Sequence, residues 1–305
     1  MSAGPHISIS AETLTYFAGI PISNSILTSL IVSGLLIAFA IMAKRSLNNI
    51  DVYGRPSAFQ NFSEMIVEGL YSFVDSVTLN KKKARVFLPF IASFFLWILL
   101  NNWLGLLPGV GTIGITHKPE QASLPSIEVQ ASEVTADDHG LEEVTETTDD
   151  HGEAVVADEH GEEAMEGEHG EEKTFIPLFR AGTADINTTF ALAIISVVVT
   201  QIIGFKYLSI GYLKKYFNFS SPIMFFVGLL ELVLEFAKIM SFAFRLFGNV
   251  FAGEVLLVVI AFLVPVIAPM PFYGLEIFVG FIQALVFAML SLVFFNMATI
   301  SHDEH

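Results

Sequence analysis

Apolar residues run in long, uncharged stretches along most of this chain. Three stretches contain no Asp, Glu, Lys or Arg and lie at residues 26–43, 86–107 and 186–205. A helix needs about 20 such residues to cross the ~30 Å hydrocarbon core of a bilayer. Each stretch is therefore predicted to be a membrane-spanning helix.

The C-terminal apolar region does not divide into spans of ordinary length. Residues 222–264 contain no proline after the first residue, and as one helix they would be roughly 65 Å long, about twice the hydrocarbon thickness. Three prolines between residues 265 and 271 end this stretch, and residues 272–299 follow as a long returning helix. The pattern favours a tilted two-helix hairpin, and a six-span arrangement with a break near Gly248 is the alternative.

The segment between Arg55 and Lys81 is amphipathic instead of apolar throughout. Its large apolar residues recur at steps of three and four, at Phe62, Met65, Ile66, Leu70, Phe73 and Val77. This periodicity predicts a helix whose apolar face lies on the membrane interface. The predicted fold is thus an all-α polytopic membrane protein with about five membrane-crossing helices and one interfacial amphipathic helix, the last two crossing helices forming the hairpin.

Acidic residues are concentrated in one segment, which divides the chain into three parts. The chain has 31 Asp and Glu against 15 Lys and Arg, yet between residues 120 and 172 there are 19 acids and no base. A low-complexity segment of this composition cannot build a core and is predicted to be a disordered loop, with weak cation capture by its His and carboxylate groups as the alternative. The predicted parts are residues 1–118, the acidic loop 119–173, and the helices of residues 174–305.

Basic residues lie on one side of the predicted spans and set their orientation. They follow the first span, precede the second and follow the third, at Lys44, Arg45, Arg55, Lys81, Lys82, Lys83, Arg85, Lys206, Lys214 and Lys215. By the positive-inside rule these loops are cytoplasmic, so the N-terminus and the acidic loop are outside and the C-terminus is cytoplasmic. Without cysteine or a glycine-rich phosphate-binding loop, we expect no cofactor, no nucleotide site in this chain and no nucleic-acid partner.

Ionisable side chains nevertheless occur inside the C-terminal apolar region. Five of them fall within the 24 residues from Glu231 to Glu254. A charge at the bilayer centre costs at least ~3 kcal/mol, so such residues usually mark a functional path. At about 100° per residue, Glu231 and Asn249 each lie within roughly 40° of Arg245 on the helix surface. The alternative is that Arg245 pairs with Glu231 or Glu235 only to hold helices together.

Four sequence motifs resemble subunit a of the membrane sector of F-type ATP synthases. The segment FRLFGNVFAGE at residues 244–254 resembles the family's signature helix, and NNWLGLLP at residues 101–108 resembles an Asn-containing motif that ends an earlier span. Gln283 with the following ALVF resembles the motif of the last helix, and the tail SHDEH is also typical. The resemblance covers most of residues 6–118 and 174–305.

This resemblance implies an ion-translocating stator subunit of a rotary ATP synthase, with residues 174–305 as the ion-translocating part. Two offset half-channels would let proton flow past Arg245 drive rotation of the c-ring and ATP synthesis. The implied partners are the c-ring proteolipid subunits, peripheral stalk subunit b, the rest of the complex and membrane lipid. The subunit itself would not be an enzyme, since nucleotide chemistry belongs to other subunits, and its place would be a bacterial inner membrane.

Four charged positions match functional residues of the family. Arg245 matches the essential arginine, and Glu254 and Glu276 match positions that line the outer half-channel. Glu231 matches a cytoplasmic exit position. Members often carry one Glu and one His at the two outer positions, whereas this chain carries two Glu, which predicts coupled titration if they lie close together.

Three amide positions match the family as well. Asn249 and Gln283 match polar residues near the arginine, and Asn102 matches a residue of the outer path. Gly105 stands where some members carry an acid, so that contribution to the outer path is absent here. A self-contained proton-coupled secondary transporter is the alternative function, but internal repeats, which would favour it, are not found. A membrane enzyme is a weaker alternative because no nucleophile or metal set supports it.

Overall fold

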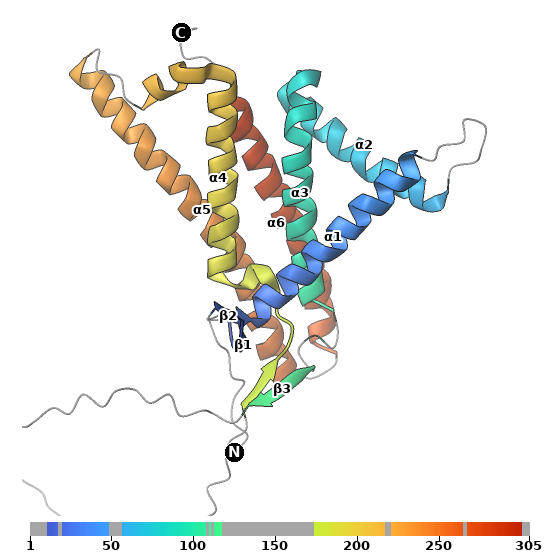
Figure 1. The fold of residues 1–305 in the computed structure, drawn as a ribbon. Helices are drawn as coiled ribbons and strands as arrows, with labels where there is room; N and C mark the ends of the chain where they lie inside the picture. Colours follow the sequence, from blue (N-terminus) through green and yellow to red (C-terminus); the bar gives the residue numbers. More distant parts are fainter. Residues whose placement is uncertain are drawn as a thin grey trace, which may run out of the picture. The chain divides into compact units, whose positions relative to one another are not determined.

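The computed structural model describes residues 11–17, 20–48, 57–107, 110, 113–117, 174–216, 221–264 and 267–300. Its helices and strands in chain order are β1 (Thr13–Phe17), β2 (Ile20–Ser23), α1 (Asn24–Asn48), α2 (Ala58–Thr78), α3 (Lys81–Gly105), β3 (Gly114–His117), β4 (Thr174–Pro177), the 3-10 helix η1 (Gly182–Ala184), α4 (Ile186–Leu208), the 3-10 helix η2 (Ser209–Lys215), α5 (Pro222–Leu263) and α6 (Pro269–Met297) (Figure 1). Strands β1 and β2 pair antiparallel, and β3 pairs with β4. The described part of the chain is thus largely helical.

The chain divides into two compact units. One comprises Met1–Ile115 with Phe175–His305, and the other is Thr116–Thr174. The predicted acidic loop, residues 119–173, lies outside the described residues, so its disorder stays a prediction.

Five described helices, α1, α3, α4, α5 and α6, are long and apolar enough to cross a membrane. This confirms the predicted all-α polytopic fold. Helix α2 is the predicted amphipathic helix. The Ser57 hydroxyl caps its first turn by accepting a hydrogen bond from the Gln60 N–H, and Leu79 ends it in the left-handed conformation. Its position on the membrane interface stays a prediction.

Helix α5 is unbroken for 42 residues, which is a length of about 63 Å. The alternative with a break near Gly248 is therefore wrong, because no interior proline interrupts the helix and α6 follows as the second arm of the hairpin. The buried residues of α5 form one narrow stripe, namely Gly228, Glu235, Phe242, Ala243, Leu246 and Gly253. Most of the helix circumference is exposed in this chain and is apolar.

Phenylalanines build the core where α3, α5 and α6 meet. The rings of Phe87 and Phe295 lie 5.7 Å apart, as do those of Phe94 and Phe287. Phe242 of α5 packs on Phe287 with 4.7 Å between ring centroids. Such aromatic pairs add about 0.5–1.5 kcal/mol beyond their burial. They fix α6 against the middle of α5, directly before Arg245.

Candidate functional site

A cavity of about 270 Å³ lies among α3, the segment after β4, α5 and α6. The residues around it include five that the sequence predicts as functional, namely Asn102, Asn249, Glu254, Glu276 and Gln283. These residues come from three helices and are up to 181 positions apart in the sequence, so the fold brings them together. Arg245 and Glu231 are not among the residues that line this cavity.

Arg180 also lines the cavity and was missed by the sequence analysis. Its Nη2 and Nε atoms lie 3.0 and 3.1 Å from Oε2 of Glu254, while the arginine is only 7% exposed. Its backbone N–H donates to the hydroxyl of Thr28 on α1 at 3.3 Å, which fixes the segment before η1. The signal in the sequence was that Arg180 is the last base before the third predicted span.

Glu276 reaches the cavity from α6 at the point where α6 crosses Gly253 of α5. A Cβ atom on Gly253 would collide with the carboxyl group of Glu276. Glycine at this position therefore makes room for the carboxyl group beside α5. The carboxyl groups of Glu254 and Glu276 thus line the same cavity.

Gly105 lines the same cavity and packs tightly against the segment before η1. A Cβ atom on Gly105 would collide with the side chain of Ala181. The acid that some family members carry here has no room in this chain. The acidic groups of the cavity therefore come from α5 and α6.

Asn102 fastens the end of α3 to two other elements. Its Nδ2 donates to the backbone carbonyl of Gly280 on α6 at 3.2 Å, and its Oδ1 accepts from the hydroxyl of Thr183 at 2.5 Å. Asn102 is buried, so both bonds are shielded from water. This residue holds the wall of the cavity in place.

Gln283 ties α6 to α5 at the position of Arg245. Its Nε2 donates to the backbone carbonyl of Arg245 at 2.8 Å, and its Oε1 accepts from Nδ2 of Asn249 at 2.8 Å. Gln283 is 5% exposed. Two hydrogen bonds from one buried amide thus position the stretch of α5 that carries the arginine.

The guanidinium of Arg245 lies on the exposed side of α5. Its Nη2 donates to the hydroxyl of Ser241 at 3.3 Å, and among the described residues Arg245 forms no ion pair. Neither Glu231 nor Glu235 neutralises it, so the interpretation as a helix-holding pair is contradicted. Its exposed neighbours on α5 include Met240 and Phe244. A permanent cation within an apolar membrane segment is energetically costly and usually marks a functional path.

Glu231 lies toward the opposite end of α5 from the cavity. It is 14 residues before Arg245, which places it about 21 Å away along the helix axis. Its side chain is half-buried. The structure therefore separates the predicted exit residue from the predicted outer residues, with Arg245 between them.

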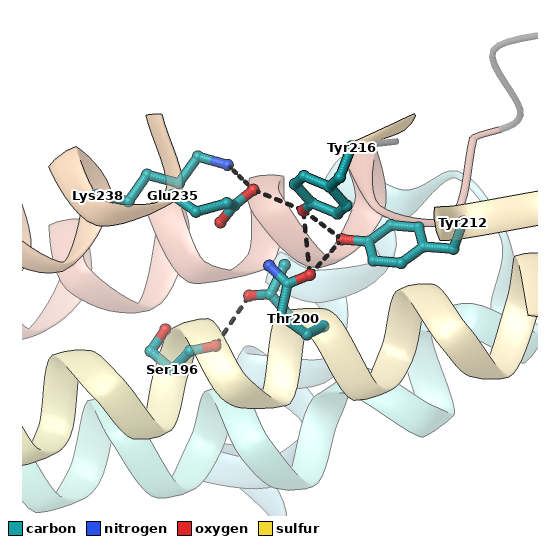
Figure 2. A network of polar contacts seen from close by, with 7 residues as sticks. Ser196, Thr200, Tyr212, Tyr216, Glu235 and Lys238 are labelled. Carbon is teal, nitrogen blue, oxygen red and sulfur yellow. Dashed lines mark hydrogen bonds and ion pairs between the residues drawn. The ribbon is translucent and has the colours of Figure 1, made fainter. Parts of the chain in front are cut away.

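A second polar cluster lies among η2, α4 and α5 (Figure 2). Oε1 of Glu235 accepts hydrogen bonds from Nζ of Lys238 at 2.8 Å and from the Tyr216 hydroxyl at 3.2 Å. Oε1 of Gln201 lies 2.9 Å from the Tyr212 hydroxyl and 3.1 Å from that of Tyr216. The sequence analysis missed this cluster because its members come from three separate elements.

Comparison with known proteins assigns the chain to a family. A family model described as ATP synthase A chain matches residues 26–296, from the first turn of α1 to the last turn of α6. The chain belongs to this family. ATP synthase subunit a of Gloeobacter violaceus is 30% identical over 282 residues, which cover 92% of this chain and 86% of that protein. ATP synthase subunit a of Syntrophobacter fumaroxidans is 28% identical over 264 residues, which cover 85% of this chain and 77% of that protein. The matched region of this subunit a homologue includes nearly all residues of the five candidate membrane spans.

Proposed function

We propose that this multi-pass member of the subunit a family is the ion-translocating stator subunit of an F-type ATP synthase. Protons pass Arg245 through two offset half-channels, and their flow turns the c-ring and drives ATP synthesis in other subunits. The observation that carries this proposal is that Arg245 is exposed on α5 and forms no ion pair among the described residues. A self-contained transporter would hold its charges in a closed site.

The c-ring supplies the anion that Arg245 lacks. A rotor carboxyl group that faces lipid is neutral, because burying its charge there is prohibitive. When it reaches Arg245, the fixed cation favours the ionised form, so the proton is released. Gln283 and Asn249 hold the backbone at Arg245 in place during this step.

The cavity serves as the outer half-channel, with Glu254 and Glu276 as its titratable groups. Basic residues lie at the ends of α1, α3 and α4 that are farther from the cavity, at Lys44, Arg45, Lys81, Lys82, Lys83, Arg85 and Lys206. By the positive-inside rule, the cavity lies toward the outer side of the membrane and Glu231 lies toward its cytoplasmic side. The membrane is a bacterial inner membrane. Each proton that crosses 100 mV from the cavity side supplies about 2.3 kcal/mol for rotation.

The partners follow from the same assignment. The exposed apolar surface of α5 faces the c-ring and lipid, subunit b holds the subunit against the peripheral stalk, and nucleotide chemistry takes place elsewhere in the complex. This subunit is not itself a catalyst and takes no nucleic-acid partner.

Glu254→Gln and Glu276→Gln test the half-channel directly. Each change keeps the shape of the side chain but removes a titratable group from the cavity. We expect each to slow passive proton flux through the membrane sector by roughly tenfold, as a barrier increase of about 1.4 kcal/mol would. The measurement is proton flux in vesicles stripped of the catalytic head. Glu68→Gln, an exposed carboxylate on α2, is the matched control and keeps normal flux. If neither cavity variant slows the flux, the assignment of the outer half-channel is wrong.

Gly253→Ala tests the position of Glu276 without removing a charge. The added methyl group takes the space of the Glu276 carboxyl group. Because the carboxyl group is then displaced from its place in the cavity, we expect passive proton flux to fall by several-fold. Gly34→Ala on α1 is the matched control, since nothing lies within 4 Å of a Cβ atom there. Equal flux in the two variants would show that the Glu276 position is unimportant.

A further inference from the structure

Glu235 is a buried carboxylate that the proposed half-channels do not use. It is 8% exposed, and its Oε1 has two donors, Lys238 and Tyr216. Its Oε2 is also buried and has no hydrogen-bond partner among the described residues. Buried polar atoms are nearly always hydrogen-bonded, so an unpartnered carboxylate oxygen has to be explained.

The groups facing Glu235 come from three elements. Lys238 on α5 supplies the full positive charge, and its ammonium lies 4.7 Å from the ring centroid of Phe294 on α6. Gln201 comes from α4, while Tyr216 follows η2. Burial raises the pKa of the Tyr216 phenol well above its ordinary value. Tyr216 therefore stays protonated and can always donate one hydrogen bond.

The hydrogen atoms of the two phenols can be arranged in two ways on the same heavy-atom positions. Each phenol has one hydrogen to donate. In the first arrangement Tyr216 donates to Glu235 and Tyr212 donates to Gln201, which suits a carboxylate. In the second, which suits a carboxyl group protonated at Oε2, Tyr216 donates to Gln201 and its oxygen accepts from Tyr212. The cluster therefore accommodates both protonation states of Glu235 without movement of the helices.

We propose that Glu235 binds and releases the translocated proton on the cytoplasmic side of Arg245. This inference rests on the proposed function. Glu235 lies ten residues before Arg245, which is about 15 Å along the axis, or half the thickness of the hydrocarbon core. A proton released beside Arg245 forms an O–H bond at Oε2 of Glu235. That bond then breaks as the proton passes to cytoplasmic water, and the carboxylate is restored while Lys238 stays charged.

This assignment adds a second carboxylate to the cytoplasmic path. Glu231 lies one helical turn closer to the N-terminal end of α5 than Glu235. Glu235 faces η2 and α4, whereas Arg245 faces outward about 80° away around the helix. Protons thus leave the rotor surface toward the tyrosine cluster and then reach the cytoplasmic end of α5.

Glu235→Gln is the direct test, measured in vesicles whose assembled membrane sector has been stripped of the catalytic head. We expect passive proton flux to fall by roughly tenfold and to lose part of its dependence on cytoplasmic pH. Glu235→Asp keeps a titratable group and should retain part of the flux. Glu68→Gln, the exposed carboxylate variant on α2, should behave as wild type. Normal flux with a normal pH profile in Glu235→Gln overturns the inference.

A double variant separates proton transfer from a structural role. Glu235→Gln with Lys238→Gln removes both charges, so no uncompensated charge remains buried. If Glu235 only balances Lys238, the double variant recovers normal flux, and the inference is overturned. If Glu235 carries protons, flux stays low.

Two further variants keep the test decisive if Glu235→Gln does not assemble. Tyr216→Phe keeps the ring but removes the hydroxyl. We expect proton flux to fall about fivefold, because a lost hydrogen bond of about 1 kcal/mol corresponds to that change in rate, and we expect the pH profile to shift. An unchanged profile overturns the inference. Arg245→Ala distinguishes the two proposals. Normal pumping by Arg245→Ala would overturn the proposed function. Normal proton flux in the Glu235 variants would overturn only the inference about Glu235.

Discussion

Replacing Arg245 by alanine is expected to abolish ATP-driven acidification of inverted membrane vesicles while the complex stays assembled. Without the fixed cation, ionisation of a rotor carboxyl group beside α5 is no longer favoured. Protons can then also leak directly from one half-channel to the other, because no positive charge repels them. The loss should exceed a hundredfold. The measurement is acidification reported by a pH-sensitive dye, with assembly checked by copurification of the ATPase head.

Two variants sharpen this prediction. Arg245→Lys should also fail, because a desolvated lysine can lose its proton whereas arginine remains charged. Ser241→Ala removes the described side-chain partner of Arg245 but keeps the guanidinium, so it should pump almost normally. Normal pumping by Arg245→Ala would show that the permanent charge has no role.

Replacing Arg180 by glutamine is expected to destabilise the outer cavity and to slow proton flux more than tenfold. The change leaves Glu254 without its counter-ion in a partly buried site, and breaking such a pair costs up to about 3 kcal/mol. The measurements are thermal unfolding of the purified complex and passive flux in vesicles.

The double variant Arg180→Gln with Glu254→Gln separates these two effects. Removing both charges should restore thermal stability, since no buried charge is left unpaired. It should not restore flux, since the cavity then lacks a titratable group of α5. Wild-type stability and flux in Arg180→Gln alone would contradict the proposed importance of the ion pair.

The membrane helices could be predicted from the sequence because hydrophobic length alone decides them. Residues 26–43 and 186–205 fall within the observed helices α1 and α4, and residues 86–107 extend two residues beyond the end of α3. The unbroken α5 was also predicted, since proline is absent from its interior and a glycine such as Gly248 is tolerated in a packed helix. Local periodicity likewise revealed α2.

The site could be predicted only where residues belonged to recognisable motifs. Asn102, Asn249, Glu254, Glu276 and Gln283 do line one cavity. Their roles in ion translocation stay predictions, as do those of Arg245 and Glu231.

Contacts between distant elements could not be read from the sequence. Arg180 meets Glu254 across 74 positions of sequence. Tyr216 reaches both Gln201 and Glu235 only because η2 folds back beside α4 and α5. Periodicity describes one helix at a time, so it carries no information about which helices become neighbours.

The buried stripe of α5 shifts its register beside Arg245. It advances by seven residues from Gly228 through Glu235 to Phe242, steps by four to Leu246, and advances by seven again to Gly253. Steps of seven drift by about 20° each around a straight helix, and a step of four turns back by about 40°. This stutter cancels the drift, so α5 has no need to coil around its neighbours. The outer side of α5 therefore presents one unrotated line of side chains along the length of the helix.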